Sequence, residues 1–438
     1  MNIDDLLNAA REHAGQQCFA VASRLYQEAL EHDSAPVRLE AARYFAARAF
    51  ASGASSDAVR FCRMALAIDA SATQGWLNLG VACRAVGDDA EALHAFAQAL
   101  RLDDNNYTAA LCVGELLEAT DRDGAAMAYF RAILQAQARG SWRNRETTPA
   151  SLSARIVHAM DFVDGGRERI FVRALEPLVD RFGASEMARV RKCLAIYLKK
   201  IAPDYSDPRQ RPRFLYFPDL PTQAYLPRAW LPWIDELEAN TDAIRREMLA
   251  VLAAGHGIEP FHEYGQLRSL VSSERGDGGW DAFFFYRHGK RFDENCANCP
   301  LTARSLEALP RAMIRDHAPE ILFSVLRPKA HILPHRGVTN ARVVAHLPLI
   351  VPPDCALNVI GDPPHVWREG EVMVFDDTFE HEAWNRSASV RVILLMDLWH
   401  PALSEAERLG LTQLVEAIGD FRVGGENILE RLDARGPS

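Results

Sequence analysis

A pattern of small and aromatic residues recurs at an interval of 34 residues in the first third of the chain. Two copies carry a glycine, an alanine and a phenylalanine at matching positions: Gly80, Ala92 and Phe96, then Gly114, Ala126 and Phe130. Small residues let two helices of a pair approach closely, and the aromatic ring fills the gap to the next pair. One such pair cannot bury its apolar face alone, so the period predicts three or four stacked pairs.

These copies resemble tetratricopeptide repeats. The run "GWLNLGVACRAVGDDAEALHAFAQALRLDDNN", which begins at Gly75, matches the consensus spacing of that motif. The dipeptide Ala-Leu recurs at 29–30, 65–66 and 99–100, so the first interval is 36 residues and the second is 34. The resemblance implies an all-α tetratricopeptide-repeat array over residues 1–138, with a groove that engages a peptide or protein. An unrelated stack of helical hairpins is the alternative.

Three prolines within "PDYSDPRQRPR" (203–213) mark the main domain boundary, because proline interrupts regular helix. Before it, residues 139–205 begin with a polar break and continue with helical spacing, which predicts a helical linker or extension. After it we expect the second domain over residues 206–405. Residues 406–438 return to helical spacing and are predicted to form a C-terminal helix and tail.

The second domain consists mostly of short β-rich runs separated by turn residues. Examples are "ILFSVLRP", "ARVVAHLPLIVP", "EVMVFDD" and "SVRVILLMDLWHP". Such runs favour a β-sandwich or jelly roll over alternating strands and helices. One amphipathic helix over residues 231–252 is predicted beside them. The expected fold is therefore multi-domain, an all-α repeat array followed by a jelly-roll domain with flanking helices.

Two of these runs place polar side chains on one face and apolar side chains on the other. Arg342, Val344 and His346 share a face of the first run, and Arg391 and Asp397 share a face of the second. The opposite faces are apolar. A polar face directed to solvent would be ordinary patterning, whereas one directed into a barrel would form a site. Composition alone does not choose between the two.

His381 and Arg391 lie ten residues apart, on either side of the turn-like "NRSAS". A hairpin that closes near Arg386 would place them opposite each other on neighbouring strands. A buried histidine beside an arginine is costly unless an anionic ligand lies between them. An iron centre that uses 2-oxoglutarate needs this combination, since neutral imidazoles bind Fe(II) and a guanidinium binds a carboxylate through two hydrogen bonds.

The segments "PHRGVTNARVVAHLPLIVP" and "EGEVMVFDDTFEHEAWNRSASVRVILLMDLWHP" resemble the aspartyl/asparaginyl β-hydroxylase family over residues 214–405. Members are Fe(II)- and 2-oxoglutarate-dependent oxygenases on a double-stranded β-helix, or jelly roll. The resemblance implies that His335 and His381, 46 residues apart (381 − 335), hold the iron. Gly337 stands where most related iron oxygenases keep a carboxylate. His331 would share the strand face of His335, and we interpret it as structural or supporting.

Within the sequence itself, none of the fourteen histidines is followed two residues later by Asp or Glu. A His-x-Asp/Glu iron motif is therefore absent, which leaves a two-histidine site as the only version of this chemistry.

The resemblance also assigns the 2-oxoglutarate contacts. Arg391 matches the arginine that binds the far carboxylate, His346 and Ser324 match further contacts, and Trp280 lines the same pocket. These four residues are the expected cosubstrate site.

On the substrate side, Arg342 matches a substrate-binding arginine. Asp377 matches an acidic residue near the metal and the substrate, which makes it a candidate both for catalysis and for substrate binding. Val344 departs from the family, because a second substrate-side arginine is expected there. An acidic substrate would lose one counter-charge at this position.

The expected reaction is hydroxylation of a C–H bond with Fe(II), 2-oxoglutarate and O2, coupled to decarboxylation of 2-oxoglutarate to succinate. The expected target is the β-carbon of an Asp or Asn residue in a peptide or protein held by the repeat groove. Two alternatives stay open. The same chemistry could act on a carrier-bound amino acid or a lipid, or the jelly roll could be catalytically silent on a scaffold for protein interaction.

Composition excludes several other classes of function. The net charge of −10 and the absence of a basic run argue against a nucleic-acid partner. No run approaches the roughly 20 apolar residues of a membrane helix, and the N-terminus lacks a signal-type apolar stretch, so we expect a cytoplasmic protein without membrane insertion. Eight cysteines fit a reducing compartment. Cys296 and Cys299 form a lone CxxC, read as structural or free thiols, with zinc or redox use as the alternative.

Overall fold

The computed structural model describes residues 3–261, 271–272 and 279–434. The chain separates into two compact units, which are described in turn. The first contains residues 1–170 and 420–438, and the second contains residues 171–419.

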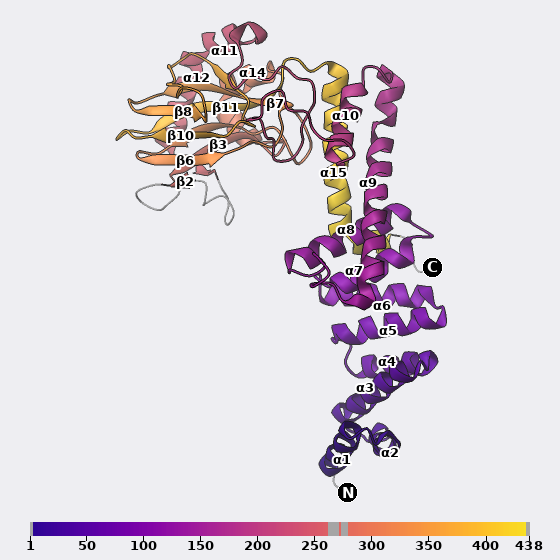
Figure 1. Ribbon diagram of the computed structural model, residues 1–438. Helices are drawn as coiled ribbons and strands as arrows, with labels where there is room; N and C mark the ends of the chain where they lie inside the picture. Colours follow the sequence, from indigo (N-terminus) through magenta and orange to yellow (C-terminus); the bar gives the residue numbers. More distant parts are fainter. Residues whose placement is uncertain (1–2, 262–270, 273–278, 435–438) are drawn as a thin grey trace. The chain divides into compact units, whose positions relative to one another are not determined.

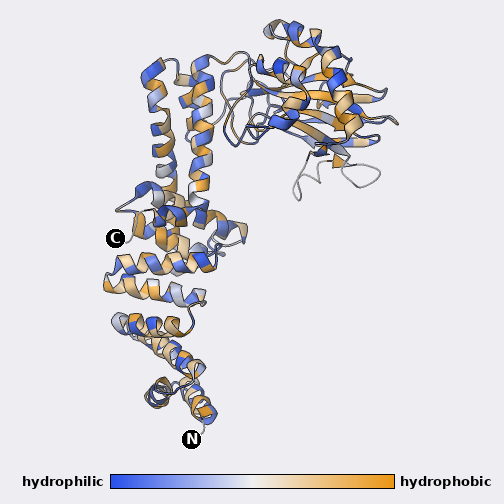
Figure 2. Ribbon diagram, turned by 180° about the vertical axis from the view of Figure 1, so that it is seen from behind, coloured by the Kyte–Doolittle hydropathy of each residue, from blue (hydrophilic) through white to orange (hydrophobic). Residues whose placement is uncertain are grey.

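Helices that follow one another in the sequence pack side by side in the first unit (Figure 1). The helices of residues 3–138 are α1 (Ile3–Gly15), α2 (Phe19–Leu30), α3 (Ala35–Ser52), α4 (Ser55–Ile68), α5 (Thr73–Val86), α6 (Asp89–Leu102), α7 (Tyr107–Leu117) and α8 (Arg122–Ala138). Hydrophobic and hydrophilic residues alternate along these helices (Figure 2), as expected where one face packs and the other meets water.

The recurring glycines are sites of close helix approach. A Cβ added at Gly80 would lie 2.5 Å from the ring of Phe96, and one added at Gly114 would lie 2.5 Å from the ring of Tyr129. The period predicts Phe130 in the second contact, but the neighbouring Tyr129 fills it. Phe130 instead lies 5.2 Å, between ring centroids, from Phe421. An aromatic ring against a glycine therefore recurs in both copies, with a shift of one residue in the second.

The end of the chain also belongs to the helical unit. Helix α16 (Ile428–Asp433) packs on α6 and α8. The guanidinium of Arg431 donates two hydrogen bonds to Asp121, at 2.7 and 2.8 Å. Asp121 is also the N-cap of α8, where its side chain accepts from the backbone N–H of Gly124. Helices α9 (Ser153–Phe182) and α15 (Glu405–Glu426) each contribute residues to both units.

The second unit contains two antiparallel sheets. Among the described residues the larger has the order β1-β3-β5-β11-β7-β9, with β4 paired to β3, and the smaller has the order β2-β6-β10-β8. The strands are β1 (Glu259–Pro260), β2 (Val271–Ser272), β3 (Trp280–Arg287), β4 (Lys290–Arg291), β5 (Ile321–Leu326), β6 (Ala330–His335), β7 (Arg342–Ile350), β8 (Cys355–Val359), β9 (Met373–Phe375), β10 (His381–Asn385) and β11 (Arg391–Trp399). Helices followed by antiparallel sheets confirm the coarse fold prediction.

The larger sheet is covered on its outer face by helices (Figure 1). Between α9 and α15 the described part of the second unit contains five α-helices: α10 (Ala188–Tyr197), α11 (Ile234–Ala239), α12 (Thr241–Ala254), α13 (Asp293–Asn298) and α14 (Pro300–Glu307). Side chains of α11, α12 and α14 form one apolar core with the outward-facing residues of β7 and β11. A second apolar cluster joins the inner face of this sheet to the smaller sheet. The inner face is therefore directed into the protein rather than toward solvent.

The single helix predicted over residues 231–252 is wrong, because α11 ends at Ala239 and α12 begins at Thr241. The side chains at the break bond to the backbone of the preceding turn. Asn240 Nδ2 donates to the carbonyl of Glu236 at 3.0 Å, and Thr241 Oγ1 donates to the carbonyl of Glu238 at 2.7 Å. Such local hydrogen bonds compete with helix continuation.

The hairpin predicted for His381 and Arg391 is also wrong. His381 on β10 pairs with His335 and Val359 in the smaller sheet, whereas Arg391 on β11 pairs with Leu326 in the larger one. The chain crosses between the sheets instead of turning back within one.

Asn385 holds this crossing in place. Its Nδ2 donates to the carbonyls of Leu326 and Ser389, at 2.9 and 2.7 Å, and its Oδ1 accepts from the backbone N–H of Ser387. The amide thus bonds to both sides of the turn. This crossing sets β10 and β11 in facing sheets, where their side chains can meet across an interior space.

Candidate functional site

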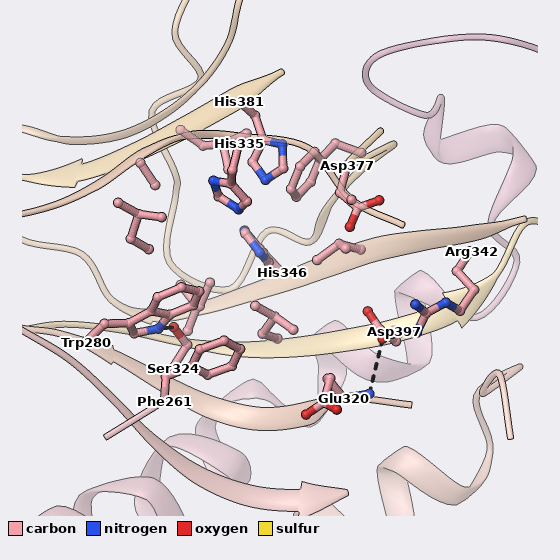
Figure 3. A pocket seen from close by; sticks show the side chains of 18 of the residues that line it. Phe261, Trp280, Glu320, Ser324, His335, Arg342, His346, Asp377, His381 and Asp397 are labelled. Carbon is pink, nitrogen blue, oxygen red and sulfur yellow. Dashed lines mark hydrogen bonds and ion pairs between the residues drawn. The ribbon is translucent and has the colours of Figure 1, made fainter. Parts of the chain in front are cut away.

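A cavity of about 270 Å³ lies between the two sheets, and side chains from both line it (Figure 3). The polar faces predicted for β7 and β11 are both directed into it. Arg342, Val344 and His346 line the cavity from β7, and Arg391 and Asp397 line it from β11. Strand alternation therefore identified residues that line the cavity. The polar faces of both strands are directed into the protein and not toward solvent.

His335 and His381 meet in the smaller sheet, where β6 and β10 pair them directly. Their ring centroids lie 4.2 Å apart, with the planes inclined by 52°. Each ring bonds to the backbone carbonyl oxygen two residues earlier in its own strand or turn. His335 Nδ1 lies 2.9 Å from the oxygen of Leu333, and His381 Nδ1 lies 2.9 Å from that of Phe379. A carbonyl only accepts, so Nδ1 carries the proton and the lone pair is on Nε2 in both rings.

Burial keeps both imidazoles neutral. It lowers the pKa of His335, and together with the nearby His335 it lowers the pKa of His381 to about 3. Neutral imidazoles with a fixed tautomer are the form that binds a divalent transition metal. The described residues contain no group of three or more His, Cys, Asp or Glu side chains that could hold a metal ion. A metal in this cavity would therefore have the two histidines as its protein ligands.

The side chain of Asp377 packs against Gly337 and leaves no space for a side chain at that position. A Cβ at position 337 would lie 2.0 Å from the carboxyl carbon of Asp377, and the Gly337 N–H donates to the carbonyl of Asp377 at 2.6 Å. The space where a side-chain ligand from position 337 would begin is thus filled by another carboxyl group. Burial, helped by the charges of Asp376 and Asp397, raises the pKa of Asp377 well above its usual range.

Arg391 is a buried cation without a counter-charge. Its side chain is 1% exposed, and no ion pair found in the described parts of the chain includes it. Nη1 lies 3.4 Å from Ser324 Oγ, the guanidinium lies 5.1 Å above the ring of Trp367, and Nε has no hydrogen-bond partner. Burial lowers the pKa of Arg391 to about 10. An anion in the cavity would supply the missing partner.

The other expected cosubstrate residues lie around this guanidinium. Trp280 Nε1 donates to Ser324 Oγ at 2.9 Å, and Trp367 Nε1 donates to His346 Nδ1 at 3.3 Å. An indole only donates, so the proton of His346 is on Nε2. Burial, with the charge of Arg391 nearby, lowers the pKa of His346 well below its usual value.

Arg342 and Asp397 form an ion pair at 2.5 Å on the same cavity wall. Asp397 Oδ2 also accepts from the backbone N–H of Glu320 at 3.1 Å, the dashed line in Figure 3. Asp397 and Trp367 were not among the residues assigned a role from the sequence. Asp397 shares the predicted interior face of its strand, which was the available signal. Nothing in the sequence pointed to Trp367.

His331 does not share the face of His335, so that prediction is wrong. Between the pairs His335–His381 and Ile332–Ala383, β6 has one residue more than β10, which is a β-bulge. The extra residue brings Ile332 to the cavity and turns His331 away. There the Nε2 of His331 lies 2.7 Å from the carboxylate of Glu382.

Cys296 and Cys299 are buried free thiols in the core outside the larger sheet. Burial raises the pKa of both, that of Cys299 to about 12. The thiolate that metal binding or redox exchange requires is therefore disfavoured at both positions. As for membranes, none of the helices in the described ranges has the length and apolar character needed to cross one.

Known proteins resemble the part of the chain that contains this cavity. The family model described as Aspartyl/Asparaginyl beta-hydroxylase matches residues 238–401. The Aspartyl/asparaginyl beta-hydroxylase of Homo sapiens is 35% identical over 178 residues, 41% of this chain and 22% of that protein. The Aspartate beta-hydroxylase domain-containing protein 2 of Rattus norvegicus is 32% identical over 252 residues, 57% of this chain and 71% of that protein.

A third relative, the Aspartate beta-hydroxylase domain-containing protein 1 of Homo sapiens, is 35% identical over 206 residues, 46% of this chain and 51% of that protein. The chain thus spans between about a fifth and about seven tenths of the length of these relatives. The matched region includes both paired histidines, the buried arginine and the ion pair. With this extent of similarity, the chain belongs to the aspartyl/asparaginyl beta-hydroxylase family.

Proposed function

We propose that the protein is an Fe(II)- and 2-oxoglutarate-dependent dioxygenase that hydroxylates a C–H bond. The observation that carries the proposal is the combination in one cavity of two histidines with matched tautomers and a buried arginine that lacks a counter-ion. The histidines suit a divalent metal, and the arginine suits the carboxylate of a dianionic cosubstrate. Membership of the family supports the same chemistry.

His335 and His381 are the proposed iron ligands, through Nε2 of each ring. The carbonyl groups that accept from Nδ1 fix the orientation of both imidazoles and increase their basicity. Iron bound there would supply the activation of O2 for C–H hydroxylation, coupled to decarboxylation of 2-oxoglutarate to succinate. Because the carboxyl group of Asp377 fills the space over Gly337, position 337 cannot supply a third protein ligand.

Arg391 is the proposed anchor for the far carboxylate of 2-oxoglutarate, with Ser324 beside it. Ser324 Oγ already accepts from Trp280 and from Arg391, so its position and that of the guanidinium are linked. His346 is neutral, and its Nε2–H can donate to a carboxylate. These side chains would bind and orient the cosubstrate before O2 reacts.

Arg342 and Asp377 are the proposed substrate-side residues, with Asp377 also positioned beside the metal ligands through its contact with Gly337. The proposed target is the β-carbon of an Asp or Asn residue in a peptide or protein. We assign residues 206–405 to a jelly-roll oxygenase domain. Residues 1–138 are assigned to a tetratricopeptide-repeat array whose groove engages the peptide. Residues 139–205 are the proposed helical linker, and 406–438 the C-terminal helix and tail.

The test is succinate formation from 2-oxoglutarate with added Fe(II) in the full chain, compared among three single variants. We expect His335→Ala and His381→Ala to lose the activity and the binding of Fe(II). His331→Ala is the matched control, because this histidine lies on the same strand but faces Glu382 and not the cavity. If the two cavity variants bind Fe(II) like the parent and all proteins lack succinate formation, the site is a silent one and the protein acts as a scaffold.

A further inference from the structure

The part of the cavity away from Arg391 has its own charge pattern. We call Arg342, Val344, Asp377 and Asp397 the substrate end. Arg391 and Asp397 are six residues apart on β11, which places them about 20 Å apart along an extended strand. Figure 3 shows Arg342, Asp377 and Asp397 on one side of the cavity and Trp280 with Ser324 on the other. The inference below rests on the proposed function, and it concerns which side chain this end accepts.

The positive charge of Arg342 is already compensated. Its guanidinium lies 2.5 Å from Asp397, and the two side chains are only 15% and 11% exposed. Charge-assisted hydrogen bonds between partly buried partners are strong, and separating them would leave Asp397 buried and unpaired. A substrate carboxylate could therefore recruit Arg342 only at the expense of Asp397.

The family resemblance implies a second substrate-side arginine at position 344, where this chain has valine. Val344 is buried, lies on the same strand as Arg342 and lines the cavity. Two further carboxyl groups, those of Asp377 and Glu320, also line the cavity. Arg213 also lines the cavity and its charge adds to the burial that lowers the pKa of His335, but its side chain is exposed, so water and salt screen part of that charge. The substrate end thus has more carboxyl groups than uncompensated buried cations.

We propose that the substrate end selects a side chain that donates hydrogen bonds, an uncharged amide or a cation, and rejects a carboxylate. An amide N–H2 or an ammonium group can donate to the oxygens of Asp377 and Asp397, while an amide oxygen can accept from Arg342 without displacing its partner. A carboxylate has no donor of its own, and it could bind Arg342 only by displacing Asp397. Of the two residues in the proposed function, the chain therefore prefers asparagine to aspartate.

The test uses the full chain with Fe(II), 2-oxoglutarate and four peptides, acetyl-Gly-Gly-Xaa-Gly-Gly-amide with Asn, Asp, Lys or Leu at Xaa. Succinate formation above the peptide-free rate is measured, and peptide affinity is measured in parallel by calorimetry with Mn(II) in place of iron. We expect the Asn or the Lys peptide to exceed both the Asp and the Leu peptide by at least about tenfold. A carboxylate that takes Arg342 would leave Asp397 buried and unpaired, which costs several kcal/mol, and a leucine side chain makes no hydrogen bond.

Two variants test the assigned cause. Val344→Arg should shift the ratio of Asp to Asn response at least about tenfold toward Asp, because it supplies an uncompensated cation at the substrate end. Val344→Leu is the matched control, since it changes size without charge and should leave the ratio near that of the parent.

The outcomes separate this inference from the proposed function. Absence of succinate in every arm, including the peptide-free one, contradicts the proposed function, and the calorimetry still decides the charge preference. Equal responses to the four peptides, in turnover and in affinity, overturn the inference, as does a preference of the parent for Asp or for Leu. A Val344→Leu variant that shifts the ratio as far as Val344→Arg overturns its electrostatic cause.

Discussion

Replacing Arg391 with methionine should make the ligand-free protein more stable and abolish its response to 2-oxoglutarate. Methionine keeps much of the side-chain length but removes the charge. The guanidinium is 1% exposed, its Nε has no hydrogen-bond partner, and no carboxylate in the described residues pairs with it. An arginine of this kind stabilises the fold only when an anion is bound.

The magnitude follows from the pKa of Arg391, which burial lowers from 12.5 to about 10. At pH 7 the group is charged in both the folded and the unfolded chain, because the pH is below both values. The folded state therefore holds the charge less favourably than the unfolded state, by about 3 kcal/mol. Removing the charge should recover part of this free energy, so we expect the free energy of unfolding of the ligand-free variant to rise by about 1–3 kcal/mol.

The same charge should dominate binding of the cosubstrate. Removing one partner of a buried, hydrogen-bonded charge pair costs about 2–5 kcal/mol, so the Kd for 2-oxoglutarate should rise by about a hundredfold. For the parent, 2-oxoglutarate at a hundred times its Kd adds about 2.7 kcal/mol of stability. For a unit of this size that corresponds to a rise in Tm of roughly 5–10 °C.

The assay is thermal unfolding of the parent and of Arg391→Met, each with Mn(II) and with or without 2-oxoglutarate. Arg408→Met is the matched control. Arg408 belongs to the same unit, burial also lowers its pKa and its Nε also lacks a partner, but it lies on α15 outside the cavity. The control should keep the full 2-oxoglutarate shift. A ligand-free Arg391→Met variant that is less stable than the parent, or one that keeps the shift, would refute the reasoning.

Three further outcomes are expected. Gly337→Ala should lose about 1–3 kcal/mol of stability in urea unfolding, because its Cβ would collide with the carboxyl group of Asp377. The double variant Gly337→Ala/Asp377→Ala should recover part of this loss. Equal stability of the single and the double variant would contradict the assigned contact. Ser324→Ala should weaken 2-oxoglutarate binding by about 1–3 kcal/mol, measured by calorimetry, since two donors lose their acceptor; unchanged affinity would exclude Ser324 from the site. The metal-free protein should lose stability as the pH falls from about 6.5 toward 3, because the folded pKa of His381, about 3, lies below its unfolded value, and urea unfolding should show a shallower slope in His381→Gln.

Strand alternation was enough to place the cavity residues of β7 and β11, because a period of two assigns every second side chain to one face. The prediction worked for Arg342, His346 and Arg391, which all line the cavity. It failed for His331, since one extra residue on β6 reverses the faces beyond the bulge. A bulge is a property of two paired strands, and the sequence of one strand does not reveal it.

The sequence also did not reveal how the fold brings His381 and Arg391 to the same cavity. Spacing suggested a hairpin, whereas Asn385 carries the chain from one sheet to the other. The contacts of Asp397 with Arg342 and of Trp367 with His346 join residues from separate strands or loops, and only the folded sheets bring them together.

The most direct test of the account is turnover of 2-oxoglutarate by the full chain with Fe(II) under ¹⁸O2, followed by mass spectrometry of the succinate. A dioxygenase places one atom of O2 in this product, so we expect succinate that carries one ¹⁸O atom in the parent and none above background in His335→Ala. No succinate from the iron-loaded parent, or succinate without the label, would contradict the assignment of this cavity to 2-oxoglutarate-dependent oxygen chemistry.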